Sequence, residues 1–151
     1  DKNLIIVTNQ SGIARGYYTE QDYLQLEKMM LNTMKNFGIK ILDVYHCPHH
    51  IDGSIASLSI ACSFRKPSPG MILSAIKEHD LDASRSIILG DKESDIEAGE
   101  NAKLAGKYLI NNGYDASKFS SKPDDVFESL YDFVERMFEC QKWLIPFIRI
   151  C

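Results

Sequence analysis

The sequence predicts an α/β domain built on a doubly wound parallel sheet. Short apolar runs rich in β-branched residues alternate along the chain with segments in which apolar residues recur at helical spacing. The first of these runs, residues 4–7, is apolar throughout, as is typical of a strand that flanking helices bury on both faces. The chain has 151 residues, of which 44% are hydrophobic and 25% charged, so it can bury a core without disulfides or metals.

The first part of the chain predicts two strands separated by a long helix. The strands are residues 4–7 and 41–45, and a polar turn follows the first of them directly. Thr19 begins the helix, because Asp22 stands three residues later as in a capping box, and Gly38 ends it. The apolar side of this helix is predicted to comprise Leu24, Met30, Leu31, Met34 and Phe37.

The alternation resumes after a long loop. Residues 47–67 keep neither a helical nor a strand period, and loops of this length are usually functional or internally cross-linked. Ser68 and Pro69 open the next helix, since Ser favours the cap position and Pro the first helical position. The remaining elements of this part are strands at 86–90 and 107–110 and a helix over 93–102.

The C-terminal part fits two interpretations. A helical apolar stripe would comprise Val126, Leu130, Phe133, Val134, Met137 and Phe138. Alternatively, Val126 and Phe127 form a last short strand before that helix. Residues 143–148 are apolar, interrupted by Pro146, and too few to span a bilayer. We therefore predict a domain over residues 1–139 and an apolar tail over 140–151, which packs on the domain or mediates self-association.

The charge balance argues against nucleic acid as the main partner. The chain has 17 Lys and Arg residues against 21 Asp and Glu residues, a net charge of -4, and no long basic run. Its four cysteines, Cys47, Cys62, Cys140 and Cys151, are too few and too unevenly spaced for a disulfide framework. We expect a cytoplasmic protein without a membrane span.

The turn after the first strand is a candidate phosphate site. It carries Thr8, Asn9, Ser11 and Arg15 on a glycine-bearing segment. Hydroxyl, amide and backbone N–H groups on such a turn can bind phosphate oxygens, although the same residue types also make ordinary strand-to-helix turns. In an open α/β sheet, ligands bind beyond the carboxyl ends of the strands, where this turn is expected to lie.

Two further charged segments are candidates for the same site. Arg65 and Lys66 precede a predicted helix and offer a bidentate fork and a point charge for phosphate. Asp91 and Asp95 follow a predicted strand, and carboxylates spaced in this way can bind Mg²⁺, which often bridges to substrate phosphate. Alone, adjacent cations are more typical of a solvated surface pair, and the acidic turn of a helix cap, but the three segments together indicate a phosphate site.

In this order, the segments resemble the haloacid dehalogenase superfamily of phosphotransferases. Residues 8–16, 47–50, 65–71 and 90–95 closely resemble its heptose-bisphosphate phosphatases and look related to its histidinol-phosphate phosphatases. The resemblance runs from about residue 4 to residue 110. It implies the fold class: α/β, a doubly wound parallel sheet of the haloacid dehalogenase-like Rossmannoid type, with the first strand and helix apparently missing.

The resemblance also implies an activity and roles for individual residues. The activity is release of the 7-phosphate of D-glycero-D-manno-heptose 1,7-bisphosphate through an aspartyl-phosphate, during synthesis of lipopolysaccharide or S-layer sugars. The implied catalytic residues are Thr8 and Asn9, which contact the phosphoryl group, and Lys66, which neutralises it. Arg65, Ser11 and Arg15 would bind the substrate. Asp91 would bind Mg²⁺, while Asp95 would orient the turn.

The family cross-links its long loop with zinc, through a Cys-x-His pair and a later Cys-x-Cys pair. Cys47, His49 and Cys62 match three of these ligands, but Phe64 stands where the fourth is expected. Structural zinc almost always has four ligands. Two alternatives remain open: His46 or His50 supplies the fourth ligand, or the site is weak or empty.

The superfamily's nucleophile is the first Asp of an Asp-x-Asp motif that follows the first strand. Only Asp1-Lys2-Asn3 precedes the strand at 4–7, and Asp80-Leu81-Asp82 follows a helical segment, so we reject that pair as the nucleophile. The sequence thus resembles a fragment or a truncated relative, and we predict that the chain as given hydrolyses no sugar phosphate. The alternatives are a non-catalytic relative that binds a phosphorylated ligand or partner, and a fragment of a histidinol-phosphate phosphatase.

Overall fold

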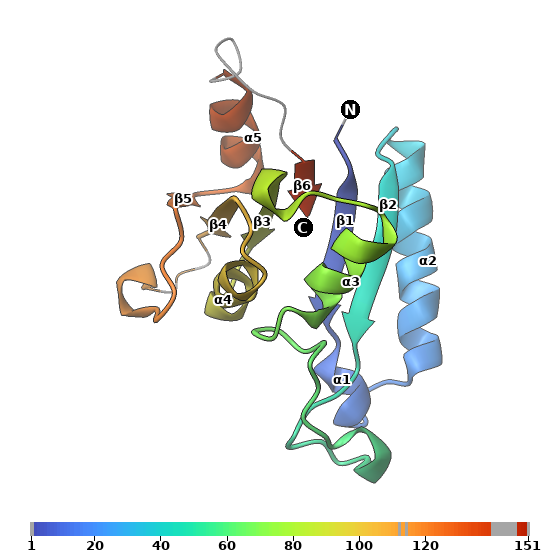
Figure 1. Cartoon of the computed structure of the whole chain (residues 1–151). Helices are drawn as coiled ribbons and strands as arrows, with labels where there is room; N and C mark the ends of the chain where they lie inside the picture. Colours follow the sequence, from blue (N-terminus) through green and yellow to red (C-terminus); the bar gives the residue numbers. More distant parts are fainter. Residues whose placement is uncertain (1, 112, 114, 140–147, 151) are drawn as a thin grey trace.

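The computed structural model describes residues 2–111, 113, 115–139 and 148–150. Its strands all pair in parallel and form two sheets (Figure 1). One sheet pairs β1 (Leu4–Asn9) with β2 (Ile41–Cys47), and the other has the order β5 (Asp125–Phe127), β4 (Gly106–Ile110), β3 (Ser86–Gly90), β6 (Ile148–Ile150). The predicted parallel sheet is therefore confirmed.

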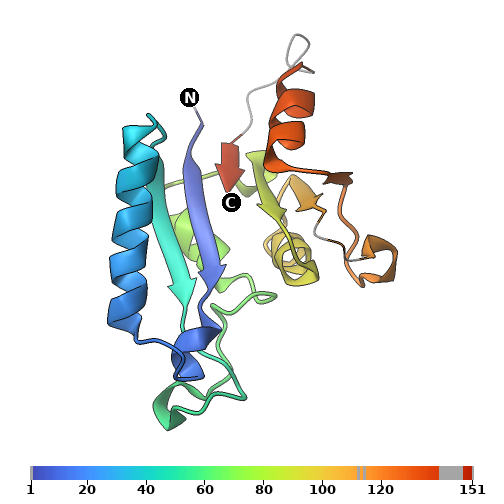
Figure 2. The same cartoon turned by 180° about the vertical axis from the view of Figure 1, so that it is seen from behind.

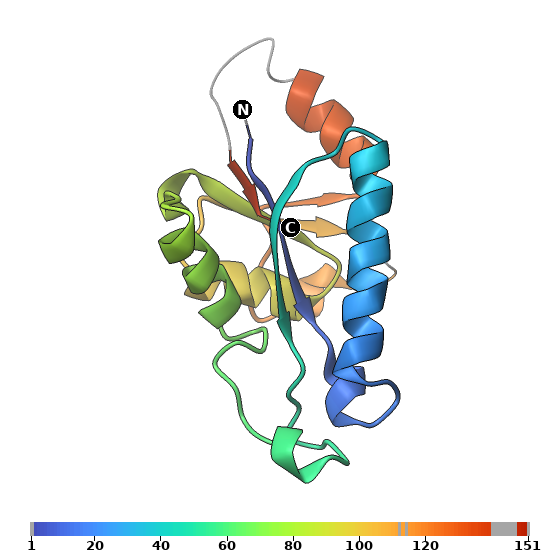
Figure 3. The same cartoon turned by 90° about the vertical axis from the view of Figure 1, so that its right-hand side faces the viewer.

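Helices cover both faces of these strands. They are α2 (Glu20–Asn36), α3 (Gly70–Glu78), α4 (Glu93–Asn101) and α5 (Leu130–Glu139), whereas the short helix α1 (Ser11–Ala14) lies beyond the end of β1. Short 3₁₀ helices occur at η1 (Ala56–Leu58), η2 (Ala83–Arg85) and η3 (Ala116–Lys118). Figure 3 shows α3 and α4 on one side of the strands and α2 and α5 on the other. This arrangement is the doubly wound architecture that the sequence predicts.

β6 lies between β1 and β3, where the two sheets meet (Figure 2). It pairs with the first half of β3, in a register that sets Ile148 against Ser86 and Ile150 against Ile88. The end of the predicted tail thus joins the sheet as a strand. The rest of that tail, residues 140–147 with Trp143, and Cys151 lie outside the described residues.

The main core lies between the strands and the helices α3 and α4. Ile5 and Val7 of β1 and Ile88 of β3 are buried there against the apolar sides of these helices. A second cluster lies on the opposite face, where the rings of Phe127 and Phe133 pack edge to face with centroids 5.0 Å apart. Val126 and Phe127 belong to β5, so the strand interpretation of this segment is correct.

Helix α2 begins and ends where the sequence predicts, but its buried side is narrower. Thr19 and Asp22 form the capping box, with the Asp22 N–H donating to Thr19 Oγ1 over 3.1 Å, and Gly38 has a φ of 74° after the last turn. The prediction is wrong for Leu24 and Phe37, which are 47% and 79% exposed. The helix covers only the two-stranded sheet, so only a narrow stripe of the helix surface contacts the sheet.

An expectation about α3 is also corrected. Ser68 does not cap the helix, because Pro69 takes the N-cap position without a side-chain hydrogen bond. His79, the residue after the end of α3, lies with Nε2 2.9 Å from Asp43 Oδ2 and so connects the end of α3 to β2. Among the described residues, no helix is long and apolar enough to cross a membrane.

Candidate active site

A polar cavity of about 440 Å³ lies beyond the carboxyl ends of β1 and β3. It is lined by Thr8, Asn9, Ser11, Arg65, Lys66, Pro67, Asp91, Lys92, Ser94 and Asp95. The fold thus brings together all three segments that the sequence predicts as a phosphate site. The exception is Arg15, which does not line this cavity.

Lys66 is held in the cavity wall by two contacts. Its Nζ lies 2.6 Å from Asp95 Oδ1 and donates to the Val7 carbonyl over 2.7 Å, and the side chain is only 12% exposed. An ammonium group has three N–H donors. Two are used by these described partners, and the third can bind an anion in the cavity.

Asn9 fixes the backbone that carries Lys66. The Asn9 Nδ2 donates to the Lys66 carbonyl over 2.9 Å, and the Lys66 N–H donates to Asn9 Oδ1 over 3.0 Å. This reciprocal pair connects the end of β1 to the segment before α3. Most of the Asn9 side-chain amide is therefore engaged with backbone groups, although it lines the cavity, and its contact with a phosphoryl group stays a prediction.

Asp95 orients the turn that carries Asp91. Its Oδ2 accepts the Asp91 N–H over 3.1 Å and the Lys92 N–H over 3.0 Å, while Oδ1 pairs with Lys66. A Cβ added at Gly90 would lie 2.3 Å from the Asp95 Cβ, so only glycine permits this packing. Both oxygens of Asp95 thus have protein partners, and Asp91, which lines the cavity, stays the predicted metal ligand.

A second group of cations lies beside the cavity. Arg65 lines the cavity and donates through Nη1 to the His49 carbonyl over 3.2 Å, and Arg15 Nη2 lies 3.0 Å from His50 Nε2. Partial desolvation, followed by the charges of Arg65 and Arg15, lowers the pKa of His50 below 6.5. At neutral pH the group therefore presents two guanidinium charges around an uncharged imidazole.

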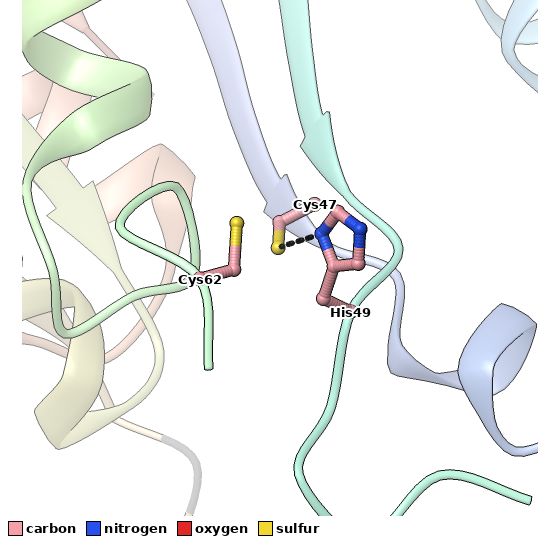
Figure 4. Close-up of side chains that lie close together, drawn as sticks. All are labelled: Cys47, His49 and Cys62. Atoms are coloured by element: carbon pink, nitrogen blue, oxygen red, sulfur yellow. Dashed lines mark hydrogen bonds between the residues drawn. The ribbon is translucent and has the colours of Figure 1, made fainter. Parts of the chain in front are cut away.

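Cys47, His49 and Cys62 form a separate cluster (Figure 4). One ligand atom from each lies within 4.8 Å of the others, and Cys47 Sγ is 3.8 Å from His49 Nδ1. Burial is the main reason that the pKa of the Cys47 thiol is raised to about 11. The end of β2 and the loop before α3 supply these side chains, so three of the four zinc ligands that the sequence suggests come together.

The alternative fourth ligands do not join this cluster. His46 Nε2 lies 3.0 Å from Glu20 Oε1, and the His46 ring packs on Tyr23 with centroids 4.6 Å apart. His50 uses Nδ1 to accept the Asp52 N–H over 3.0 Å and turns Nε2 toward Arg15. Within the described residues, the cluster therefore has three ligands.

The chain is similar to curated phosphatases. A D-glycero-alpha-D-manno-heptose-1,7-bisphosphate 7-phosphatase from Photorhabdus laumondii is 49% identical over 115 residues, which are 76% of this chain and 63% of that relative. A D-glycero-beta-D-manno-heptose-1,7-bisphosphate 7-phosphatase from Pasteurella multocida is 41% identical over 130 residues, 85% of this chain and 70% of that relative. The chain belongs to the heptose-bisphosphate phosphatase family.

Two further comparisons agree with membership of this family. A family model for HAD-hydrolase-like proteins matches residues 63–133. The crystal structure of the D,D-heptose 1,7-bisphosphate phosphatase from B. bronchiseptica, complexed with magnesium and phosphate, superposes with a TM-score of 0.76 and 26% identity. The superposition covers 91% of this chain and 74% of that chain. The family's fold and its place in the superfamily are as the motifs indicate.

Sequence reasoning missed several features of this site. It did not find the short helix α1, the pairing of Lys66 with Asp95, or the hydrogen bond from Gln10 to Thr8. The first two depend on segments far apart in the chain, which carry no local signal. Gln10 stands in the glycine-bearing turn, but nothing in the spacing distinguishes it from the neighbouring polar residues.

Proposed function

We propose that this chain forms the phosphoryl- and Mg²⁺-binding part of a phosphatase that removes the 7-phosphate of D-glycero-D-manno-heptose 1,7-bisphosphate. The observation that carries the proposal is one cavity lined by Thr8, Lys66 and Asp91 from three separate segments. The names of the Photorhabdus and Pasteurella relatives support the substrate class. These relatives carry opposite anomeric labels, so we propose no anomer.

The proposed chemistry is neutralisation of the charge that develops on the phosphoryl group. Lys66 supplies a fixed positive charge, and the Thr8 hydroxyl supplies a hydrogen bond, both preorganised before substrate arrives. Mg²⁺ fits the donor set, since it prefers carboxylate oxygen, water and substrate phosphate as ligands. Asp91 would hold it, and the ion would add charge stabilisation at the transferring group.

Turnover needs a nucleophile in addition to this cavity. The superfamily takes it from an Asp-x-Asp motif, and the Asp80–Asp82 pair does not line the cavity. Asp82 instead accepts hydrogen bonds from the Ser84 N–H and hydroxyl at the start of η2. Ligand binding, and not hydrolysis, is therefore the direct test of the site in these 151 residues.

We propose that Arg15 and Arg65 bind the phosphate that is not removed. Arg65 reaches the cavity, and Arg15 lies beyond it beside His50, so the charges extend away from Lys66. A bisphosphate would place one phosphate at Lys66 and the other at Arg15 and Arg65, whereas a monophosphate such as histidinol phosphate could not occupy both places. This preference distinguishes the heptose branch from the histidinol-phosphate branch.

The test is calorimetric titration of the chain, in the presence of Mg²⁺, with the heptose bisphosphate and with histidinol phosphate. We expect the bisphosphate to bind at least about tenfold more tightly, and Arg15→Gln to remove most of that difference. Arg85→Gln is the matched control, because Arg85 lies in η2 and does not line the cavity. Equal affinities for the two ligands would refute the substrate assignment.

We also propose that Cys47, His49 and Cys62 bind zinc with three protein ligands. The support is their proximity, with ligand atoms within 4.8 Å of one another. Three ligands leave an open position, so the affinity should be below that of a closed four-ligand site. Zinc content after purification without chelator tests this proposal, and an equal zinc content in Cys62→Ser would contradict it.

A further inference from the structure

A chain of hydrogen bonds leads from the phosphate cavity to a tyrosine outside it. The Tyr18 hydroxyl donates to Gln10 Oε1 over 2.7 Å, and Gln10 Nε2 donates to Thr8 Oγ1 over 3.0 Å. Thr8 lines the cavity, whereas Gln10 and Tyr18 line a separate hollow. The side chains thus form a continuous path between the two.

The direction of these bonds determines what the Thr8 hydroxyl can do. A threonine hydroxyl has one proton to donate and accepts hydrogen bonds through its oxygen lone pairs. In Thr8 the oxygen accepts from Gln10, so the proton points elsewhere and is available to an acceptor in the cavity. Phosphoryl oxygens are acceptors only, and a donor whose direction is already fixed binds them without a reorganisation cost.

The structure holds Gln10 and Tyr18 in place independently of the cavity. The Gln10 backbone N–H donates to the Cys47 carbonyl over 2.8 Å, which fixes this residue against the end of β2. The Tyr18 ring packs directly over Gly12, where an added Cβ would lie 2.2 Å from the ring. The glycine therefore makes room for the tyrosine, and the tyrosine hydroxyl reaches Gln10 as a result.

We propose that Tyr18 and Gln10 are positioning residues that orient the Thr8 hydroxyl toward the phosphoryl group. Neither residue touches the ligand, and both act through Thr8. The inference rests on the proposed phosphate site and adds to it two residues that lie outside the cavity. The amide of Gln10 transmits the effect, because its oxygen accepts from Tyr18 and its nitrogen donates to Thr8.

The first test is a double-mutant cycle on the binding of inorganic phosphate with Mg²⁺, measured by calorimetry. Tyr18→Phe keeps the ring over Gly12 and removes only the hydroxyl, and we expect it to weaken binding by about three- to tenfold. In a Thr8→Val background the same change should have no further effect, because the group on which it acts is gone. Tyr17→Phe is the control, since Tyr17 is 75% exposed and does not line the cavity.

The outcomes distinguish the proposed orienting role of Tyr18 and Gln10 from a general structural role. Equal losses in the two backgrounds would mean that Tyr18 acts on packing. Unchanged binding in Tyr18→Phe would mean that its hydroxyl does not act on Thr8, and tighter binding would mean that the hydrogen bonds run in the opposite direction. Any of these results overturns the proposal.

A second measurement does not depend on phosphate. Three-bond couplings to the Thr8 methyl group report its χ1 rotamer. We expect one rotamer in the unmodified chain and averaging in Gln10→Leu. A single Thr8 rotamer in both the unmodified chain and Gln10→Leu would refute the orienting role of Gln10. If the rotamer responds as expected while no phosphate binds, the proposed function and the orienting role toward phosphate fail, and only the side-chain coupling stands.

Discussion

Replacing Asp95 by asparagine removes one negative charge from the wall of the phosphate cavity and changes the shape of the side chain little. The Asp95 side chain is 6% exposed and makes an ion pair of 2.6 Å with Lys66. It also accepts two backbone N–H groups, over 3.0 and 3.1 Å. The asparagine oxygen can keep the two hydrogen bonds from the backbone N–H groups, but the NH₂ group then faces the ammonium group of Lys66.

The expected loss follows from these three contacts. Breaking a buried ion pair by removing one partner costs about 3–5 kcal/mol, and the retained carbonyl oxygen offsets part of that, so we expect Asp95→Asn to lower the free energy of unfolding by about 3 kcal/mol. In a Lys66→Met background Asp95 is itself the charge left unpaired, so replacing it relieves that charge and should cost at most about 1 kcal/mol, for weaker hydrogen bonds to the turn.

Urea denaturation followed by circular dichroism measures both losses. Glu100→Gln is the matched control, because Glu100 is an exposed residue of the same helix, and its effect should stay within about 0.5 kcal/mol. A loss below about 1 kcal/mol for Asp95→Asn, or the same loss in both backgrounds, would refute the role assigned to this pair.

Three further predictions concern other parts of the chain. Burial raises the pKa of the Asp43 carboxyl, but hydrogen bonds from His79 and the Val44 N–H outweigh it and hold that pKa below 3.8. The stability that Asp43 contributes, at most about 1 kcal/mol because the side chain is partly exposed, should therefore be present above its ordinary pKa of 3.8 and lost as the pH falls below it through the lowered folded-state pKa. A stability difference between the unmodified chain and Asp43→Asn that grows on acidification would contradict this. Phe64→Cys should complete the zinc site and raise zinc affinity at least about tenfold in competition with a chromophoric chelator, with Ser63→Cys as control; equal gains for both would count against the three-ligand cluster. Finally, the chain of 151 residues should release no phosphate from the heptose bisphosphate, and Mg²⁺-dependent release abolished by Asp91→Ala would show this to be wrong.

Local signals in the sequence located most of the fold. The Thr19–Asp22 capping box lies within four residues, and the strand at 86–90 contains three consecutive apolar residues, 87–89, followed by a glycine. Helix α1 was missed because tertiary contacts hold it: the Ala14 N–H donates to the Pro48 carbonyl, and its own carbonyl accepts from the Ser54 N–H. The side-chain spacing of a four-residue helix gives no period to detect.

The burial of individual residues was harder to predict than the elements themselves. Leu24 and Phe37 have the helical spacing of buried residues, yet they are exposed because the neighbouring sheet is only two strands wide at α2. For the candidate site, the motif segments located the cavity. The family resemblance implied separate roles for Asp91 and Asp95, but the ion pair between Asp95 and Lys66 became visible only in the structure.

The account depends most on the claim that one cavity binds a phosphoryl group and Mg²⁺ together. Calorimetric titration of the chain with inorganic phosphate, with and without Mg²⁺, tests it directly. We predict that binding is detectable with Mg²⁺, and is weakened at least about tenfold in its absence and in Lys66→Met or Asp91→Asn. Phosphate binding that is absent, or that is the same in all four experiments, would contradict the account.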